Sequence, residues 1–157
     1  MLVKRTALVA LSVVALLAPL SRGTSQEAPR ATQLEARVDA FTGADWAIHA
    51  GAGVTVPLGT YVRLGVVSGL GAGADGLSGR ADLVGRFTLD PFREKRWAPY
   101  AVGGVSARFD DRSRQFVVLM AGAEGPVRRG LAPAVEFGFG GGFRFGVALR
   151  QGAPRRR

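Results

Sequence analysis

The sequence has no cysteine, one histidine and no long apolar run beyond its first 20 residues. The absence of cysteine excludes disulfides, thiol nucleophiles, iron–sulfur clusters and the usual zinc sites, which need Cys or clustered His ligands. The lack of an apolar run of about 18 residues after the N-terminus argues against a helical membrane protein. A hydrophobic content of 47% is too high for a disordered chain. The 157 residues therefore predict one compact domain without redox chemistry.

The first 25 residues have the organisation of a secretory signal peptide. Lys4 and Arg5 precede the apolar stretch Thr6–Leu20, which is too short to span a bilayer comfortably. Small residues at Gly23 and Ser25 favour cleavage after Ser25, and a retained N-terminal anchor is the alternative. We therefore expect a signal peptide over residues 1–25, a linker over 26–33, a barrel domain over 34–150 and a basic tail over 151–157.

Apolar residues recur at every second position from Leu34 to Arg150, which is the pattern of strands with one apolar and one polar face. The pattern divides into eight segments joined by short turns, and an even number of strands suits an up-and-down meander. It predicts an all-β fold, an eight-stranded antiparallel transmembrane β-barrel that follows the signal peptide. The glycine-rich stretch Gly69–Gly76 is expected to be a loop between the third and fourth strands.

Alternation alone does not say whether the apolar face lies inside the barrel or faces lipid. Three features favour lipid: glycines beside charges of both signs on the polar face, few bulky leucines on the apolar face, and aromatic residues near strand ends, where membrane girdles occur. Those aromatic residues are Phe41, Trp46, Tyr61, Phe87, Trp97, Tyr100 and Phe109. The alternative is an exported soluble β-barrel with the faces reversed, which would bind a lipid or small ligand.

The stretch from Arg96 to Val105 reads Arg-Trp-Ala-Pro-Tyr-Ala-Val-Gly-Gly-Val, so a Pro-Tyr pair opens a segment that continues into paired glycines. With the signal peptide and the eight alternating segments, it resembles the small outer-membrane β-barrel protein domain family of diderm bacteria. The resemblance covers roughly residues 34–150 and implies a barrel in the bacterial outer membrane, often without a known biochemical activity. Such chains usually end on an aromatic residue, whereas this one continues past Phe145 to Arg157.

The polar face carries more arginines than carboxylates. Inside a narrow barrel these groups would have to pair, because unpaired buried charge is costly. An eight-stranded barrel leaves an interior only wide enough for side chains, so we expect a plugged lumen despite the porin-like pattern. The predicted network is Arg37, Arg63, Arg80, Asp82, Arg86, Arg108, Glu124, Glu136 and Arg144, with Glu35, Asp39 and Arg150 on the same face.

Three features of the sequence suggest chemistry, and each has a simpler explanation. Gly71–Gly76 matches the G-x-G-x-x-G spacing of dinucleotide sites, but the helix that such a site requires does not follow. The adjacent acids at 110 and 111 are expected to be a solvated turn and no cation site. His49 could form a hydrolase triad with Ser106 or Ser68 and an acid, although no nucleophile motif accompanies it.

We therefore predict no catalytic, cofactor-binding or metal site. The expected function is that of a non-enzymatic outer-membrane β-barrel with a structural or envelope-interaction role. A membrane-embedded lipid hydrolase that uses His49 is the second alternative, after the soluble barrel.

The formal net charge of +9 suggests anionic partners. Arginines on the polar face alternate with glycines and acids and form no contiguous basic surface, so no nucleic-acid partner is expected. The predicted partners are outer-membrane lipid and, at the turns and tail, anionic envelope polymers or lipid phosphates. The turn and tail cations are Arg93, Lys95, Arg96, Arg128, Arg129, Arg155, Arg156 and Arg157.

Overall fold

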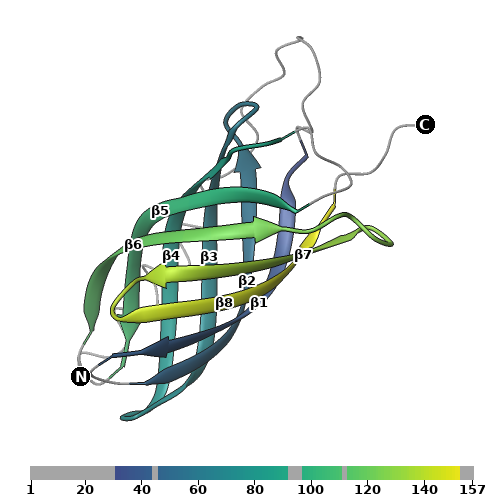
Figure 1. The fold of residues 1–157 in the computed structure, drawn as a ribbon. Coiled ribbons are helices and arrows are strands. Elements are labelled where there is room, and N and C mark those ends of the chain that lie inside the picture. Colours follow the sequence, from purple (N-terminus) through teal and green to yellow (C-terminus); the bar gives the residue numbers. More distant parts are fainter. Residues whose placement is uncertain (1–30, 44–45, 92–96, 111–112, 153–157) are drawn as a thin grey trace.

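The chain folds into a closed barrel of eight antiparallel strands, as a computed structural model shows (Figure 1). The structure describes residues 31–43, 46–91, 97–110 and 113–152, so the predicted signal peptide and the end of the tail lie outside the described residues. The predicted all-β, up-and-down barrel is confirmed. The strands are β1 (Gln33–Thr42), β2 (Ala47–Pro57), β3 (Val62–Gly73), β4 (Gly76–Thr88), β5 (Ala98–Phe109), β6 (Arg114–Glu124), β7 (Leu131–Phe139) and β8 (Phe143–Gln151).

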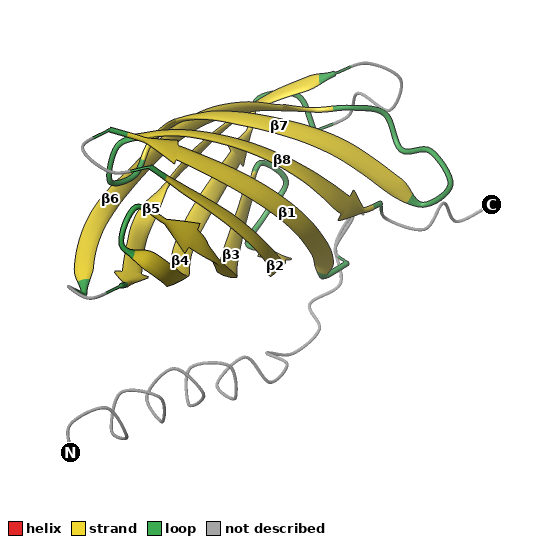
Figure 2. Ribbon diagram, turned by 90° about the horizontal axis from the view of Figure 1, so that it is seen from below, coloured by secondary structure: helices red, strands yellow, loops and turns green. Residues whose placement is uncertain are grey.

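Pairing between β1 and β8 closes the barrel (Figure 2). The register of this pair runs from Glu35 opposite Arg150 to Thr42 opposite Phe143. Closure removes the exposed edges on which an open sheet would aggregate. We call the end of the barrel where β1 begins and β8 ends the terminal end, and the opposite one the far end. Among the described residues, no helix is long and apolar enough to cross a membrane.

The buried charged side chains of the strands point into the barrel, and most large hydrophobic side chains point outward. On β1, Asp39 has no exposed surface, whereas its neighbour Val38 is 46% exposed. On β8, Arg144 is 2% exposed and Phe145 54%. Successive side chains of a strand lie on opposite faces, so one pattern of period two places charges inside and hydrophobic groups outside along both strands. This is the arrangement that the lipid-facing prediction requires, and the reverse of a soluble barrel.

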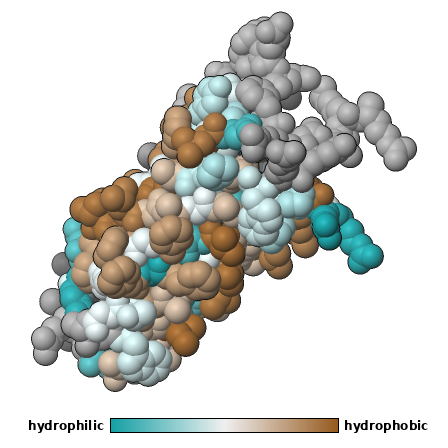
Figure 3. All heavy atoms as spheres, in the orientation of Figure 1, coloured by the Kyte–Doolittle hydropathy of each residue, from teal (hydrophilic) through white to brown (hydrophobic). Residues whose placement is uncertain are grey.

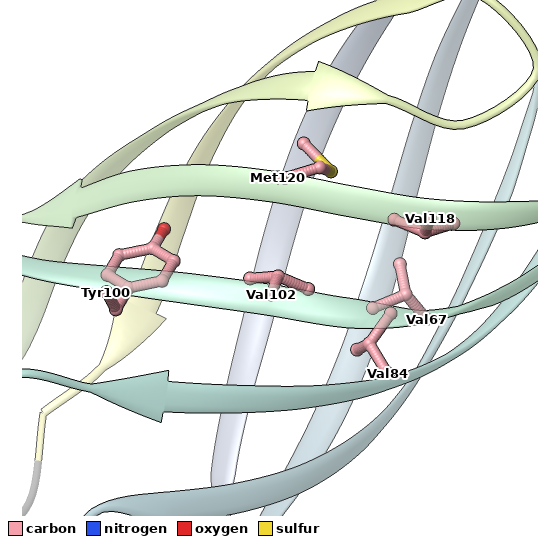
Figure 4. Packing of buried hydrophobic residues seen from close by; sticks show 6 residues of the cluster. All are labelled: Val67, Val84, Tyr100, Val102, Val118 and Met120. Carbon is pink, nitrogen blue, oxygen red and sulfur yellow. The ribbon is translucent and has the colours of Figure 1, made fainter.

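A small apolar cluster lies among the charged side chains of the lumen (Figure 4). Six buried residues from β3 to β6 pack together there. They are Val67, Val84, Tyr100, Val102, Val118 and Met120. A cavity of about 20 Å³ remains between this cluster and charged residues such as Glu35, Arg37 and Arg150, with room for about one water molecule.

The expected loop at Gly69–Gly76 was wrong. β3 continues to Gly73 and β4 begins at Gly76, so only two residues separate the strands. The inward-facing glycines let β3 approach β2 closely, because a Cβ on Gly71 would overlap the backbone oxygen of Ile48. Glycine here serves close strand packing rather than a flexible loop.

The prediction that aromatic residues lie at the outer girdles was wrong for two of them. Phe41 and Tyr100 are buried in the lumen. Each shares the parity of inward-facing residues on its strand, Phe41 with Asp39 and Tyr100 with Arg108, and parity decides the face. The other five are exposed on the outer surface: Trp46, Tyr61, Phe87, Trp97 and Phe109.

We predict that Gly71→Ala destabilises the barrel by roughly 1–3 kcal/mol, the range for overpacking a tight site, because its methyl group would meet the β2 backbone. Gly103→Ala on β5 is the matched control, since a Cβ there meets no atom within 4 Å. Urea unfolding of both variants, followed by tryptophan fluorescence, measures the difference. Equal midpoints for the two variants would contradict the close approach of β3 to β2.

Candidate functional site: a charge network in the lumen

Asp39 on β1 is the centre of the network near the far end. Its carboxylate accepts a bidentate pair of hydrogen bonds from Arg37, at 2.8 Å from Nε and 2.7 Å from Nη2. It also accepts from Arg80 Nη2 at 2.6 Å and from Arg144 Nε at 3.2 Å. Asp82 joins the same group through an ion pair of 2.8 Å with Arg144. Two carboxylates therefore serve guanidiniums that come from β1, β4 and β8.

Arg37 connects this group to the centre of the lumen. Its guanidinium contacts Glu35 at 3.0 Å and Glu136 at 2.5 Å, besides Asp39. Glu136 in turn accepts from Arg150 Nη2 at 2.5 Å and from the Tyr100 hydroxyl at 2.8 Å. Such charge-assisted, multiply bonded pairs are the kind that offset the cost of burying charge.

The network continues to the terminal end through Arg150. This side chain contacts Glu35 at 2.8 Å and Glu124 at 3.1 Å. Arg86 reaches the same Glu124 carboxylate at 3.4 Å and donates to the Gln33 side chain at 2.5 Å. A connected path of charged side chains thus runs from one end of the lumen towards the other.

Buried aromatic rings support the arginines at both ends of this path. Near the far end, the guanidinium carbons of Arg80, Arg108 and Arg144 lie 4.7–5.2 Å from the centre of the Phe41 ring. Near the terminal end, those of Arg86 and Arg150 lie 5.6 and 4.8 Å from the centre of the Tyr100 ring. Cations in this position are attracted by the ring face, most strongly where water is excluded.

The structure brings eight of the nine predicted network residues into the lumen core or its terminal mouth. There each carboxylate contacts a guanidinium, and each arginine contacts a carboxylate or an aromatic ring. The exception is Arg63, which is half-buried and bonds to Thr55 and to the backbone oxygen of Ala31, with no ion pair among the described residues. Sequence reasoning did not assign Tyr100 and Gln33 to the network. Their inward parity on β5 and β1 was the signal that could have identified them.

His49 lies inside the barrel and its Nε2 is hydrogen-bonded to the Ser78 hydroxyl. Ser68, one of the two partners considered for a triad, is on the outer face and is exposed. The Nδ1 atom of His49 is buried without a hydrogen-bond partner in the described part of the chain, so no acid orients the ring as a triad requires. The described residues also contain no group of three or more potential metal ligands.

Asp110 forms a 2.8 Å ion pair with Arg114, which agrees with a charged turn at this position. Its neighbour Asp111 lies outside the described residues.

Comparison with solved structures shows a similarity to the solution NMR structure of the de novo designed transmembrane β-barrel TMB2.3. The TM-score is 0.50 and the sequence identity 20%, over 78% of this chain and 95% of that one. At this identity the likeness concerns the fold. No protein-family model and no curated protein matches the sequence.

We predict that Glu136→Gln destabilises the barrel by roughly 3–5 kcal/mol, because it removes a buried charge that pairs with both Arg37 and Arg150 in the lumen. Tyr100→Phe removes one hydrogen bond to the same carboxylate and should cost about 1.5–3 kcal/mol. Equilibrium unfolding of the two single variants and the double variant gives the coupling. Additive effects would show that Tyr100 and Glu136 do not act together.

Proposed function

We propose that the chain is a membrane-spanning barrel of the bacterial outer membrane with a structural, non-enzymatic role in the envelope. The observation that carries the proposal is the inverted barrel, in which the charges are inside and the large hydrophobic side chains outside. Lipid is the solvent that suits such a surface, because strands of a membrane barrel alternate between an apolar outer face and a polar lumen. The likeness to a designed transmembrane barrel supports the same proposal.

The extent of the apolar outer surface argues for lipid. Exposed large hydrophobic residues occur on all eight strands, and they cover much of the wall in Figure 3. A shallow apolar hollow of about 480 Å³ on β6, β7 and β8 is lined by Phe137, Phe139, Phe143 and Phe145 among others. Water-soluble monomers rarely expose contiguous apolar patches of more than a few hundred Å².

Strand length and aromatic placement fit a bilayer. The strands have 9–13 residues, and a tilted strand needs about 9–11 to cross the hydrocarbon core. Trp46 lies at the far end, whereas Trp97, Tyr61 and Phe87 lie near the terminal end, all exposed on the outside. Tryptophan and tyrosine favour the two membrane interfaces, where one part of the ring is apolar and the other meets water. We place the terminal end on the periplasmic side.

A structural role without catalysis or transport agrees with the content of the lumen. His49 is buried beside Ser78 without an orienting acid, which disfavours the lipid-hydrolase alternative. Ion pairs and stacked rings occupy the interior, which disfavours a diffusion pore. The soluble-barrel alternative would need an apolar interior large enough for a ligand, and the cavity of about 20 Å³ is too small for one.

Membrane insertion is tested by charging the outer face. We predict that Leu83→Arg, in the middle of β4, destabilises the barrel folded in phospholipid bilayers by about 2–4 kcal/mol. The reason is that it places a cation near the bilayer midplane. Thr60→Arg in the exposed turn before β3 is the control and should have little effect. Recovery of the mature wild-type chain from the soluble periplasm, without detergent, would contradict the proposal directly.

We also predict that the purified protein shows no steady conductance in a planar bilayer. The network fills the lumen, and an eight-stranded barrel has no further space for an aqueous channel. Single-channel recording of the wild type and of Glu136→Ala is the measurement, and both should remain at background because one truncated side chain opens no continuous path. Regular current steps from the wild-type protein would refute the plugged lumen.

A further inference from the structure

The hairpin between β6 and β7 has an unusual residue at its tip. Arg128 and Leu131 exchange two backbone hydrogen bonds, of 2.8 and 3.0 Å, and enclose the two-residue loop Arg129–Gly130. Both loop residues have positive φ, 52° and 80°. Asn, Asp or Gly is the usual first residue of such a type I′ turn, since a larger side chain makes this conformation costly. Arg129 is the one non-glycine residue with positive φ in the described part of the chain.

The tip is held in place while its cations stay available. The backbone oxygen of Gly130 accepts a 2.8 Å hydrogen bond from the Gly152 amide at the end of β8. Arg128 and Arg129 are exposed and form no ion pair or hydrogen bond through their side chains with other described residues. The loop after β6 projects at the terminal end in Figure 1, and a hydrophilic projection lies at the same place in Figure 3.

Apolar side chains surround the base of this tip on the outer surface. Val127 and Leu131 flank the turn and are about half-exposed. The Trp97 ring, also half-exposed, lies beside Gly125, where an added Cβ would be 3.3 Å from the ring. The order along the surface is therefore apolar wall, tryptophan, then arginine. Side chains in that order suit the boundary of a bilayer, where tryptophan lies at headgroup depth and cations reach the phosphates.

We propose that the β6–β7 tip binds the phosphate groups of anionic phospholipids in the leaflet at the terminal end. The proposal rests on the proposed membrane-spanning orientation and adds a site and a lipid class to it. Charge complementarity selects the partner: the tip presents two exposed guanidiniums, whereas the β3–β4 tip at the far end presents the exposed carboxylate of Asp75. An arginine retained where the turn prefers asparagine is consistent with a role for its charge, because strained residues cluster at functional positions.

The two tryptophans allow a direct test, because Trp97 lies at the terminal end and Trp46 at the far end. The barrel is reconstituted in phosphatidylcholine vesicles that contain either brominated phosphatidylglycerol or brominated phosphatidylcholine at equal fractions. Trp46→Phe leaves Trp97 as the reporter, and Trp97→Phe leaves Trp46. We expect Trp97 to be quenched more by the anionic lipid, with a preference of about fivefold for each arginine, which added salt weakens.

Variants of the tip identify the residues responsible. In the Trp46→Phe background, Arg128→Gln combined with Arg129→Asn should abolish the preference, while Arg129→Lys retains it. Arg129→Asn alone should raise the resistance to unfolding, since Asn suits the left-handed position, and still weaken the preference. Asp75→Asn is the matched control, because it changes the charge of the β3–β4 tip at the far end by one unit. We expect it to leave the lipid preference reported by Trp97 unchanged.

The outcomes separate this inference from the proposed function. Absence of quenching by either brominated lipid would overturn the membrane-spanning proposal itself. Equal quenching of Trp97 by both lipids in the wild type would leave insertion intact and overturn the anionic-lipid site. A preference that survives the double variant but disappears when the chain ends at Gly152 would assign lipid binding to the tail and likewise overturn the hairpin site.

Discussion

Each buried carboxylate of the lumen has to serve several guanidiniums, because arginines outnumber acids there. Asp39 accepts from Arg37, Arg80 and Arg144, which lie on three different strands. These contacts can form together only when the sheet has curved into a closed barrel. Closure in turn depends on them, since unpaired charges inside would cost several kcal/mol each. The Glu35–Arg150 ion pair joins directly opposed residues of β1 and β8, so one pair of side chains serves both the network and the closing seam.

A lumen occupied by charges leaves little interior volume for an apolar core. The main buried hydrophobic cluster of the described residues has six members, Tyr100 among them. Most of the large hydrophobic side chains therefore lie on the outer surface, and in the proposed membrane-spanning state contact with lipid supplies the free energy gained by removing them from water. The charge network and the apolar wall are two consequences of the same alternation, and the membrane proposal depends on both.

Much of this architecture could be predicted from the sequence, because a period of two assigns residues to faces without knowledge of the fold. It predicted eight strands, closure and most of the charged residues in the lumen, but it did not assign Tyr100 and Gln33 to the network. It did not predict which arginine meets which carboxylate, since contacts across the lumen depend on the stagger of distant strands. Phe41 and Tyr100 were expected in an outer girdle because they are aromatic, although their positions along β1 and β5 indicated the inner face. Composition likewise misled at Gly69–Gly76, where glycines allow tight strand packing. The bond between His49 and Ser78 joins strands that are not neighbours and left no local signal.

The rings of Phe41 and Tyr100 explain why such a lumen would stay closed. Each lies against arginines near one end of the network, so a solute that enters from either end meets a stacked ring and cation before it reaches the interior. Moving Arg144 or Arg150 would also break ion pairs, because each of them takes part in both kinds of contact. The interior then behaves as one unit that resists partial opening. A barrel of this kind can act on its surroundings only through its outer wall and its two rims, and the exposed cations of the β6–β7 hairpin lie on one of those rims.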